Sequence, residues 1–151
     1  MRYKWVIIIG LILLSTFLNA GEEKSKHHFS VVVASCFHSD TVGLNINGNV
    51  VIDNEIASSD FSTGVTNIAV YQTDGGLFTF SGNDDGKRLN PVEFKRNITV
   101  EILVNGIRTI RTIDLKKGKI IFVDNCSFEE AKGQTSKRVM FKQFRKTVAL
   151  E

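Results

Sequence analysis

The sequence contains few proline, tryptophan and tyrosine residues. It has one proline among 151 residues, one tryptophan, at Trp5, and two tyrosines, at Tyr3 and Tyr71. Carbohydrate-binding faces rely on tryptophan and tyrosine rings, whereas phenylalanine, which occurs eleven times here, more often fills cores. The composition therefore disfavours a sugar-binding platform and favours a protein partner.

No signature of a catalytic class is present. The chain lacks a Gly-x-Ser-x-Gly elbow, a His-Glu-x-x-His pair, a phosphate-binding glycine loop and a dinucleotide fingerprint. Only three histidines could activate a nucleophile. Paired carboxylates remain an alternative, because strands bring distant residues together, and they would indicate a small secreted hydrolase. The candidate carboxylates are Asp40, Asp60, Asp84 and Asp85.

Neither sign of charge dominates the chain. The formal net charge is +3, and removal of Arg2 and Lys4 with the first 20 residues would lower it to +1. This balance argues against a nucleic-acid partner. The C-terminal segment 127–151 is basic, with six Lys or Arg residues against three Glu residues. Such a segment can contact an anionic membrane surface, which would suit an envelope-associated structural protein.

The sequence also lacks an apolar run of the roughly 20 residues that span a bilayer. Arg2 and Lys4 precede the short apolar run Trp5–Leu14, and Ala20 precedes a plausible cut. These features predict a signal peptide over residues 1–20, with an uncleaved anchor as the less favoured alternative. We expect a flexible N-terminus over 21–28 and a single domain over 29–151, secreted or periplasmic.

The chain has two cysteines, Cys36 and Cys126. In an exported protein two cysteines usually pair, so we predict one disulfide that ties the first strand to the last part of the core. No second cysteine lies two or three residues from either one, which disfavours a cysteine metal site.

Two short stretches are candidate metal sites. His27, His28, His38 and Asp40 form the only cluster suited to zinc or copper. The stretch GNDDG, residues 82–86, offers hard oxygen donors, but it lacks the alternate spacing and closing glutamate of an EF-hand. Ordinary turns explain both stretches better. We therefore expect no metal and no cofactor.

From Phe29 onward the apolar residues form short β-branched runs bounded by Gly, Asn or Asp, a pattern typical of strands. The runs predict an all-β fold: an antiparallel β-sandwich of about seven to nine strands, immunoglobulin-like in general architecture. The region 98–123 is expected to form an antiparallel meander with Val100, Ile102 and Val104 on one face. Its segment IRTIRTI, residues 107–113, spaces isoleucines by three, which predicts a bulge or a partly covered outer face.

One pattern occurs twice in the chain. TVGLNINGNVVI, residues 41–52, aligns without a gap with TVEILVNGIRTI, residues 99–110. The shared positions are alternating apolar residues and the pairs Asn47-Gly48 and Asn105-Gly106, which are typical of two-residue type I′ turns. None of them is charged, nucleophilic or metal-binding. The repeat therefore predicts two equivalent hairpins and not two copies of a functional site.

The tail from Arg138 to Leu150 admits two interpretations. As a strand it places Val139 and Phe141 on one face, and as an amphipathic helix it gathers most of its apolar residues on one side. The strand is favoured because the preceding chain consists of strands, whereas the helix would indicate a membrane surface or a partner groove.

Two polar, glycine-bearing stretches interrupt the strands, at 57–64 and 81–91. Exposed loops at the end of a rigid β-sandwich commonly carry binding contacts. The sequence thus predicts a small exported, non-enzymatic binding or adhesion module with a protein partner, acting through these loops or an open sheet edge. The candidate binding residues are Ser59, Asp60, Phe61, Asn83, Asp84, Asp85, Lys87 and Arg88.

Overall fold

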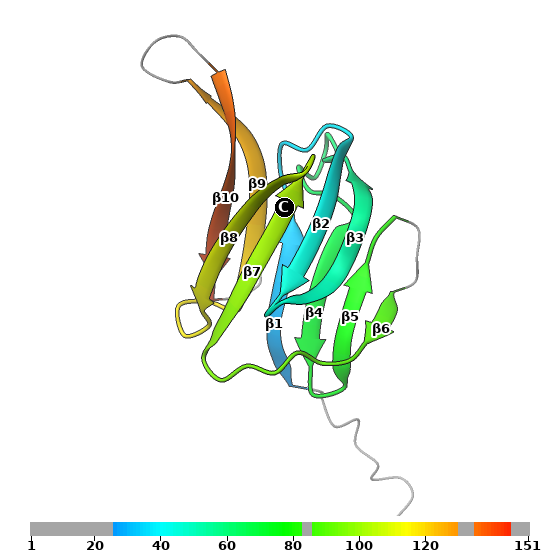
Figure 1. The fold of residues 1–151 in the computed structure, drawn as a ribbon, viewed down its shortest axis with the longest axis vertical. Coiled ribbons are helices and arrows are strands. Elements are labelled where there is room, and N and C mark those ends of the chain that lie inside the picture. Colours follow the sequence, from blue (N-terminus) through cyan, green and yellow to red (C-terminus); the bar gives the residue numbers. More distant parts are fainter. Residues whose placement is uncertain (1–25, 83–85, 130–134, 146–151) are drawn as a thin grey trace, which may run out of the picture.

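The computed structural model describes residues 26–82, 86–129 and 135–145, and within these ranges the chain forms strands and no helix. This confirms the predicted all-β class. The predicted signal peptide lies outside the described residues. The strands are β1 (His27–Val33), β2 (Asp40–Ile46), β3 (Asn49–Ala57), β4 (Ile68–Thr73), β5 (Gly76–Phe80), β6 (Lys87–Leu89), β7 (Asn97–Val104), β8 (Ile107–Asp114), β9 (Ile120–Glu129) and β10 (Thr135–Phe144) (Figure 1).

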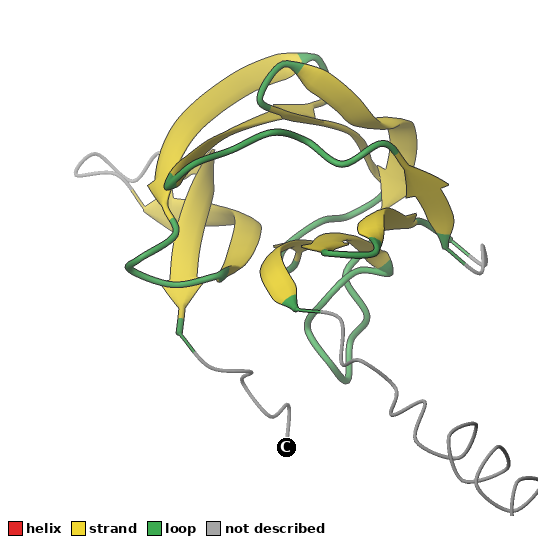
Figure 2. Ribbon diagram, turned by 90° about the horizontal axis from the view of Figure 1, so that it is seen from below, coloured by secondary structure: helices red, strands yellow, loops and turns green. Residues whose placement is uncertain are grey.

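The strands form two sheets, a six-stranded sheet in the order β10-β9-β1-β4-β5-β6 and a four-stranded sheet in the order β3-β2-β7-β8. Figure 2 shows the two sheets curving around a common interior. Alternate residues of β2 and β7 are buried, as the two-residue period of a strand requires. Val100, Ile102 and Val104 share the buried face of β7, as predicted. Apolar residues of both sheets belong to one core cluster.

The repeated pattern forms the whole four-stranded sheet. β2–β3 and β7–β8 are hairpins, and Asn47 and Asn105 each have a φ of 50°, the positive value that a type I′ turn needs. The two hairpins pair through β2 and β7 in a reciprocal way. The Asn47 N–H donates to Thr99 O (2.9 Å), and the Asn105 N–H donates to Thr41 O (2.8 Å). The prediction that the repeat forms two hairpins with the same turn is confirmed.

The predicted topology is wrong at three points. β1 pairs in parallel with β9 over residues 30–33, so the sheets are not wholly antiparallel. The meander predicted over 98–123 ends at Asp114, because the next turn carries the chain across to the other sheet, where β9 runs in the direction of β1. The described residues also contain ten strands instead of seven to nine, since the short β6 lies in a segment predicted to be a loop.

Irregular strand pairing occurs in the β2–β3 hairpin, although the sequence predicted a bulge in residues 107–113. β8 pairs with β7 in continuous register over all eight of its residues, so the bulge, one of the two alternatives predicted there, is absent. The three-residue spacing is accommodated instead by exposure: Ile107 is 72% exposed and Ile110 47%. β3 carries two irregularities opposite β2, and Asn54 within it has a φ of 52°.

The disulfide and the tail agree with the sequence predictions. Cys36, just after β1, is bonded to Cys126 of β9 with an Sγ–Sγ distance of 2.04 Å. The tail is a strand as far as Phe144, which confirms the favoured interpretation, and residues 146–150 of the predicted segment lie outside the described residues. Val139 and Phe141 of this strand pack against the core.

Candidate functional site

The loop between β3 and β4 is organised by the side chain of Asp60. Asp60 Oδ1 accepts hydrogen bonds from the backbone N–H groups of Ser62 and Thr63, both at 2.9 Å, and from the Ser62 hydroxyl at 2.5 Å. The Asp60 N–H donates to Val65 O, and the Gly64 N–H donates to Asp60 O, both at 2.9 Å. A short carboxylate suits this position because it can cap the backbone groups that follow it.

These hydrogen bonds stabilise the ionised form of the carboxylate. They lower the pKa of Asp60 from 3.8 to about 2, with the Ser62 hydroxyl as the largest cause, followed by the N–H groups of Thr63 and Ser62. Because Asp60 is fully exposed, solvent weakens the energetic value of the shift. The carboxylate nevertheless stays ionised, and keeps its hydrogen-bond donors, throughout the physiological range.

Ser59 ties the same loop to the connection between β1 and β2. Its hydroxyl donates to Ala34 O (2.8 Å) and accepts from the Phe37 N–H (3.0 Å). Ala34 and Phe37 are buried, and Cys36 of the disulfide lies between them in the chain. Ser59 therefore supports the loop from beneath, and its hydroxyl is already occupied.

Phe61 lies at the tip of this loop with its side chain in solvent. Its exposed fraction is 106%, the largest among the exposed large apolar side chains of the described residues. The residues on either side of it are joined to each other, because the Ser62 N–H and hydroxyl both donate to the Asp60 carboxylate. A single exposed apolar side chain is common on protein surfaces. A fully exposed aromatic ring carried by a fixed loop is a less ordinary arrangement, and it is the feature of this end of the molecule that is best suited to contact a partner.

The second predicted loop contributes less to the described surface. Asn83, Asp84 and Asp85, the candidate oxygen donors of the stretch 82–86, lie outside the described residues. Lys87 and Arg88 lie in β6, which pairs with β5 at the edge of the six-stranded sheet. Of the predicted binding residues, Ser59, Asp60 and Phe61 thus share the loop between β3 and β4, whereas Lys87 and Arg88 lie on strand β6.

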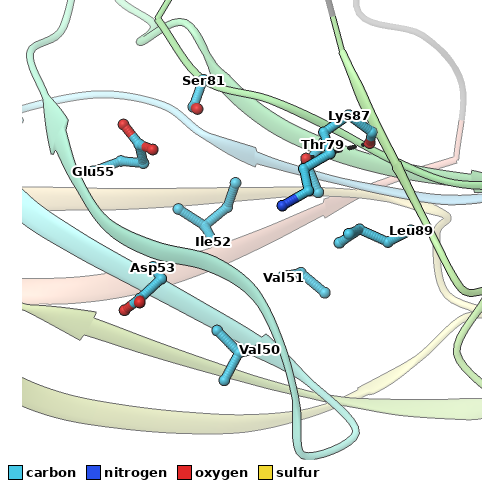
Figure 3. A pocket seen from close by; sticks show the side chains of 9 residues that line it. All are labelled: Val50, Val51, Ile52, Asp53, Glu55, Thr79, Ser81, Lys87 and Leu89. Carbon is cyan, nitrogen blue, oxygen red and sulfur yellow. Dashed lines mark hydrogen bonds between the residues drawn. The ribbon is translucent and has the colours of Figure 1, made fainter. Parts of the chain in front are cut away.

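Lys87 borders a hollow of about 290 Å³ between β3 and β6. Figure 3 shows its ammonium group directed into the hollow, while the carboxyl groups of Asp53 and Glu55 on β3 diverge from one another. Glycoside cleavage needs two carboxyl groups facing each other across a bond. Asp53 and Glu55 do not have that arrangement.

Asp40, a candidate metal ligand and catalytic carboxylate in the sequence, is buried and saturated with donors. It accepts from the His38 N–H (3.0 Å), the Asn105 amide (2.7 Å) and the Asn125 amide (3.3 Å), and Lys137 Nζ lies 3.5 Å away. Burial alone would raise the pKa of Asp40, but the donors of His38, Asn105 and Lys137 outweigh it and lower the pKa. Asp40 therefore joins the two sheets beside the disulfide.

The histidines of the predicted metal cluster are separated. His27 and His28 begin β1, and His38 follows its other end. His28 Nε2 lies 2.6 Å from Asp74 Oδ1, whereas His38 Nδ1 lies 3.2 Å from Cys36 O. Within residues 26–82, 86–129 and 135–145 no three His, Cys, Asp or Glu side chains are grouped as a metal site would require.

One feature of the surface could not be defined from the sequence, namely the sheet edges. Apart from Phe61, the large apolar side chains exposed in the described part lie on the two edge strands of the four-stranded sheet: Val50 and Ile56 on β3, and Ile107 and Ile110 on β8. The irregular isoleucine spacing of β8 was the only signal of this exposure. It could not be interpreted without knowing that β8 is an edge strand.

Comparisons with family models, curated proteins and solved structures find no match to this chain. Among the described residues, no helix has the length and apolarity needed to cross a membrane.

Proposed function

We propose that the protein is a small exported, non-enzymatic binding module that uses Phe61 as the anchor of its contact with a protein partner. One observation carries the proposal: a fully exposed phenylalanine ring sits on a loop that Asp60 and Ser59 hold in place.

The energetics of this loop favour recognition of a pocket. Transfer of a phenylalanine side chain from water into an apolar pocket contributes about 1.5 to 3 kcal/mol. Ordering of a mobile loop would offset much of that gain, but the bonds from Ser62 and Thr63 to Asp60 already order this one. Buried aromatic anchors of this kind dominate many protein interfaces. A protein pocket therefore suits Phe61 better than a carbohydrate does.

A sugar platform on the six-stranded sheet is less well supported. The ring of Tyr71 is stacked on those of Phe78 and Phe80, at centroid distances of 5.0 and 5.4 Å and interplanar angles of 20° and 18°. Other protein rings thus occupy part of its stacking surface. A sugar stacks on the open face of an aromatic ring, so Tyr71 offers only a restricted platform.

We also propose that the fold is an antiparallel β-sandwich of immunoglobulin-like general architecture, apart from the parallel β1–β9 pair. The second part of this proposal is that the protein is secreted or periplasmic. The two sheets and their shared core support the first part. The bond between Cys36 and Cys126 supports the second, because disulfides persist in oxidising compartments. The signal peptide over residues 1–20 remains a prediction from the sequence.

The two alternative functions are less well supported by the described residues. The donors around Asp40 and the turn around Asp60 already occupy two of the carboxylates proposed for a hydrolase. A role at a membrane surface was expected to use a helical tail, whereas the tail up to Phe144 is a strand of the six-stranded sheet. Neither alternative explains the exposure of Phe61.

Partner capture tests the proposal. The mature protein is immobilised and exposed to the envelope or medium fraction of its own source, beside the variants Phe61→Ser and Ile56→Ser. Ile56 is a matched control, because it is also a large apolar residue and is 61% exposed. We expect one stoichiometric partner to be retained by the wild type and by Ile56→Ser and lost by Phe61→Ser. Equal recovery of that partner by all three baits would contradict the role of Phe61.

A further inference from the structure

The edges of the two sheets leave an open groove between β8 and β10. Among the described strands, each of the two is paired on one side only, β8 with β7 and β10 with β9. Two hollows of about 320 and 250 Å³ lie between them and adjoin, since both are lined by Thr109 and Val139. Figure 1 shows β8 and β10 close together at their lower ends and diverging towards the upper ends.

One end of the groove is closed by Gln143 of β10. Its amide Nε2 donates to Asp114 O of β8 (3.1 Å) and to Gly118 O (3.0 Å). Val139 and Phe141 of β10 pack against the core and form an apolar side of the groove. The groove therefore has an apolar lining, a closed end and an open end.

The backbone of β8 faces this groove with groups that pair with no other described strand. Val104 and Ile107 flank a two-residue turn and so form a hydrogen-bonded pair. Because the direction of backbone bonding alternates along a strand, the N–H and C=O groups of Arg108, Ile110 and Thr112 point away from β7. Because the register of β8 is continuous, this edge has no bulge, and another strand can pair with it.

The charge of the groove has one sign. Four cations line the two hollows, and no described Asp or Glu lines either one. Lys137 and Lys142 are partnered by Asp40 and Asp124 at 3.5 and 2.8 Å. The exposed side chains of Arg111 and Arg138 make no ion pair with any described residue. Two guanidinium groups are thus available to a carboxylate ligand.

We propose that this groove binds an extended acidic segment of a partner protein, which adds to β8 as a strand. Its backbone pairs with Arg108, Ile110 and Thr112, its apolar side chains cover Val139 and Phe141, and its carboxylates meet Arg111 and Arg138. The site is separate from Phe61 and does not depend on it.

A second copy of the chain is the less suitable occupant. Its β3 edge also has carboxylates, at Asp53 and Glu55, and exposed aliphatic residues. However, β3 is interrupted twice in its pairing with β2, and such bulges twist an edge away from extended pairing. A flexible acidic segment has no such obstacle.

The probe is a capped nine-residue peptide in which valine alternates with glutamate or threonine, and the control peptide has lysine in place of glutamate. Amide exchange is measured by NMR on the full mature protein. The glutamate peptide should slow exchange of the Arg108, Ile110 and Thr112 amides, while those of Thr109 and Arg111, which already face β7, change little. The lysine peptide should bind at least tenfold more weakly.

Charge reversal distinguishes this groove from the rest of the protein surface. The double variant Arg111→Glu/Arg138→Glu should bind the glutamate peptide at least tenfold more weakly. The matched reversal Lys26→Glu/Lys95→Glu lies outside the groove and should leave the affinity for this peptide unchanged, as should Phe61→Ser. Equal affinity for the two peptides, or protection on another edge, would overturn the proposal. So would self-association in sedimentation velocity that Arg111→Glu/Arg138→Glu abolishes, because the occupant would then be a second copy.

Discussion

Asp60 and Asn105 show how single short polar side chains fix the local backbone. Asp60 Oδ1 accepts from the two N–H groups that follow it. Asn105 takes a φ of 50°, accepts from the Thr41 N–H (2.9 Å) and donates to Asp40 (2.7 Å). Both roles follow from the ability of these residues to replace a backbone partner and, for Asn, to tolerate positive φ.

The first prediction concerns the effect of pH on the Asp60 loop. The folded-state pKa of Asp60 is about 2, below the ordinary 3.8, so its contribution to loop stability is fully present above about pH 4 and is lost as the pH falls towards 2. An NMR titration of the Ser62 and Thr63 amide protons should show a midpoint near pH 2. A midpoint near the ordinary value would mean that these amides do not bond the carboxylate.

The second prediction concerns Asn105. Asn105→Gly keeps the positive φ but loses the side-chain bonds, including that to the charged Asp40, and should lower the free energy of unfolding by about 2 kcal/mol. Asn105→Ala also has to adopt the left-handed conformation, at a cost of about 1 kcal/mol more. Urea denaturation measures both. Equal stability of the two variants would contradict a conformational cost at this turn.

At the scale of elements, local and non-local features differ in how far the sequence determines them. The hairpins could be predicted, because alternation and the turns at Asn47 and Asn105 are local signals. The sheet that β9 joins could not be predicted, because β9 pairs with residues 30–33, which lie about ninety residues away in the chain. For the candidate site, polar composition predicted the exposed loop around Phe61. It could not reveal that Ser59 supports the loop while Phe61 faces solvent.

The third prediction concerns the attachment of β10. Gln143→Met keeps the length of the side chain but removes the donor to Asp114 O and Gly118 O. Leaving partly buried carbonyl groups unpaired should cost about 1 to 2 kcal/mol. Amide exchange should become faster in β10 than in the β2–β7 pair. Uniform exchange rates across both sheets would show that Gln143 does not hold β10 in place.

At the scale of the whole molecule, the disulfide and Asp40 join the sheets at one end. Cys36 and Cys126 are 90 residues apart in sequence and link the β1–β2 connection to β9. Asp40 begins β2 of the other sheet and accepts a hydrogen bond from the side-chain amide of Asn125, the residue before Cys126. This end also carries the loop of Phe61, so the covalent bond lies beneath the proposed contact surface.

The fourth prediction concerns the disulfide, whose two cysteines are 90 residues apart in the sequence. Cys36→Ala/Cys126→Ala should lower the free energy of unfolding by on the order of 4 kcal/mol, the chain-entropy value for a closed loop of this size. Denaturation in urea measures the difference, and a thiol count on the denatured, unreduced wild type provides the control. Two free thiols in the wild type would contradict the pairing.

The central claim is that Phe61 anchors a protein partner. It is tested most directly by the dissociation constants of the captured partner for the wild type and for Phe61→Ser, measured with Phe61→Tyr as the variant that keeps the ring. Loss of an aromatic anchor costs about 2 kcal/mol or more, so Phe61→Ser should bind roughly 30-fold more weakly, with unchanged stability, while Phe61→Tyr stays near the wild type. A ratio near one for Phe61→Ser would contradict the claim.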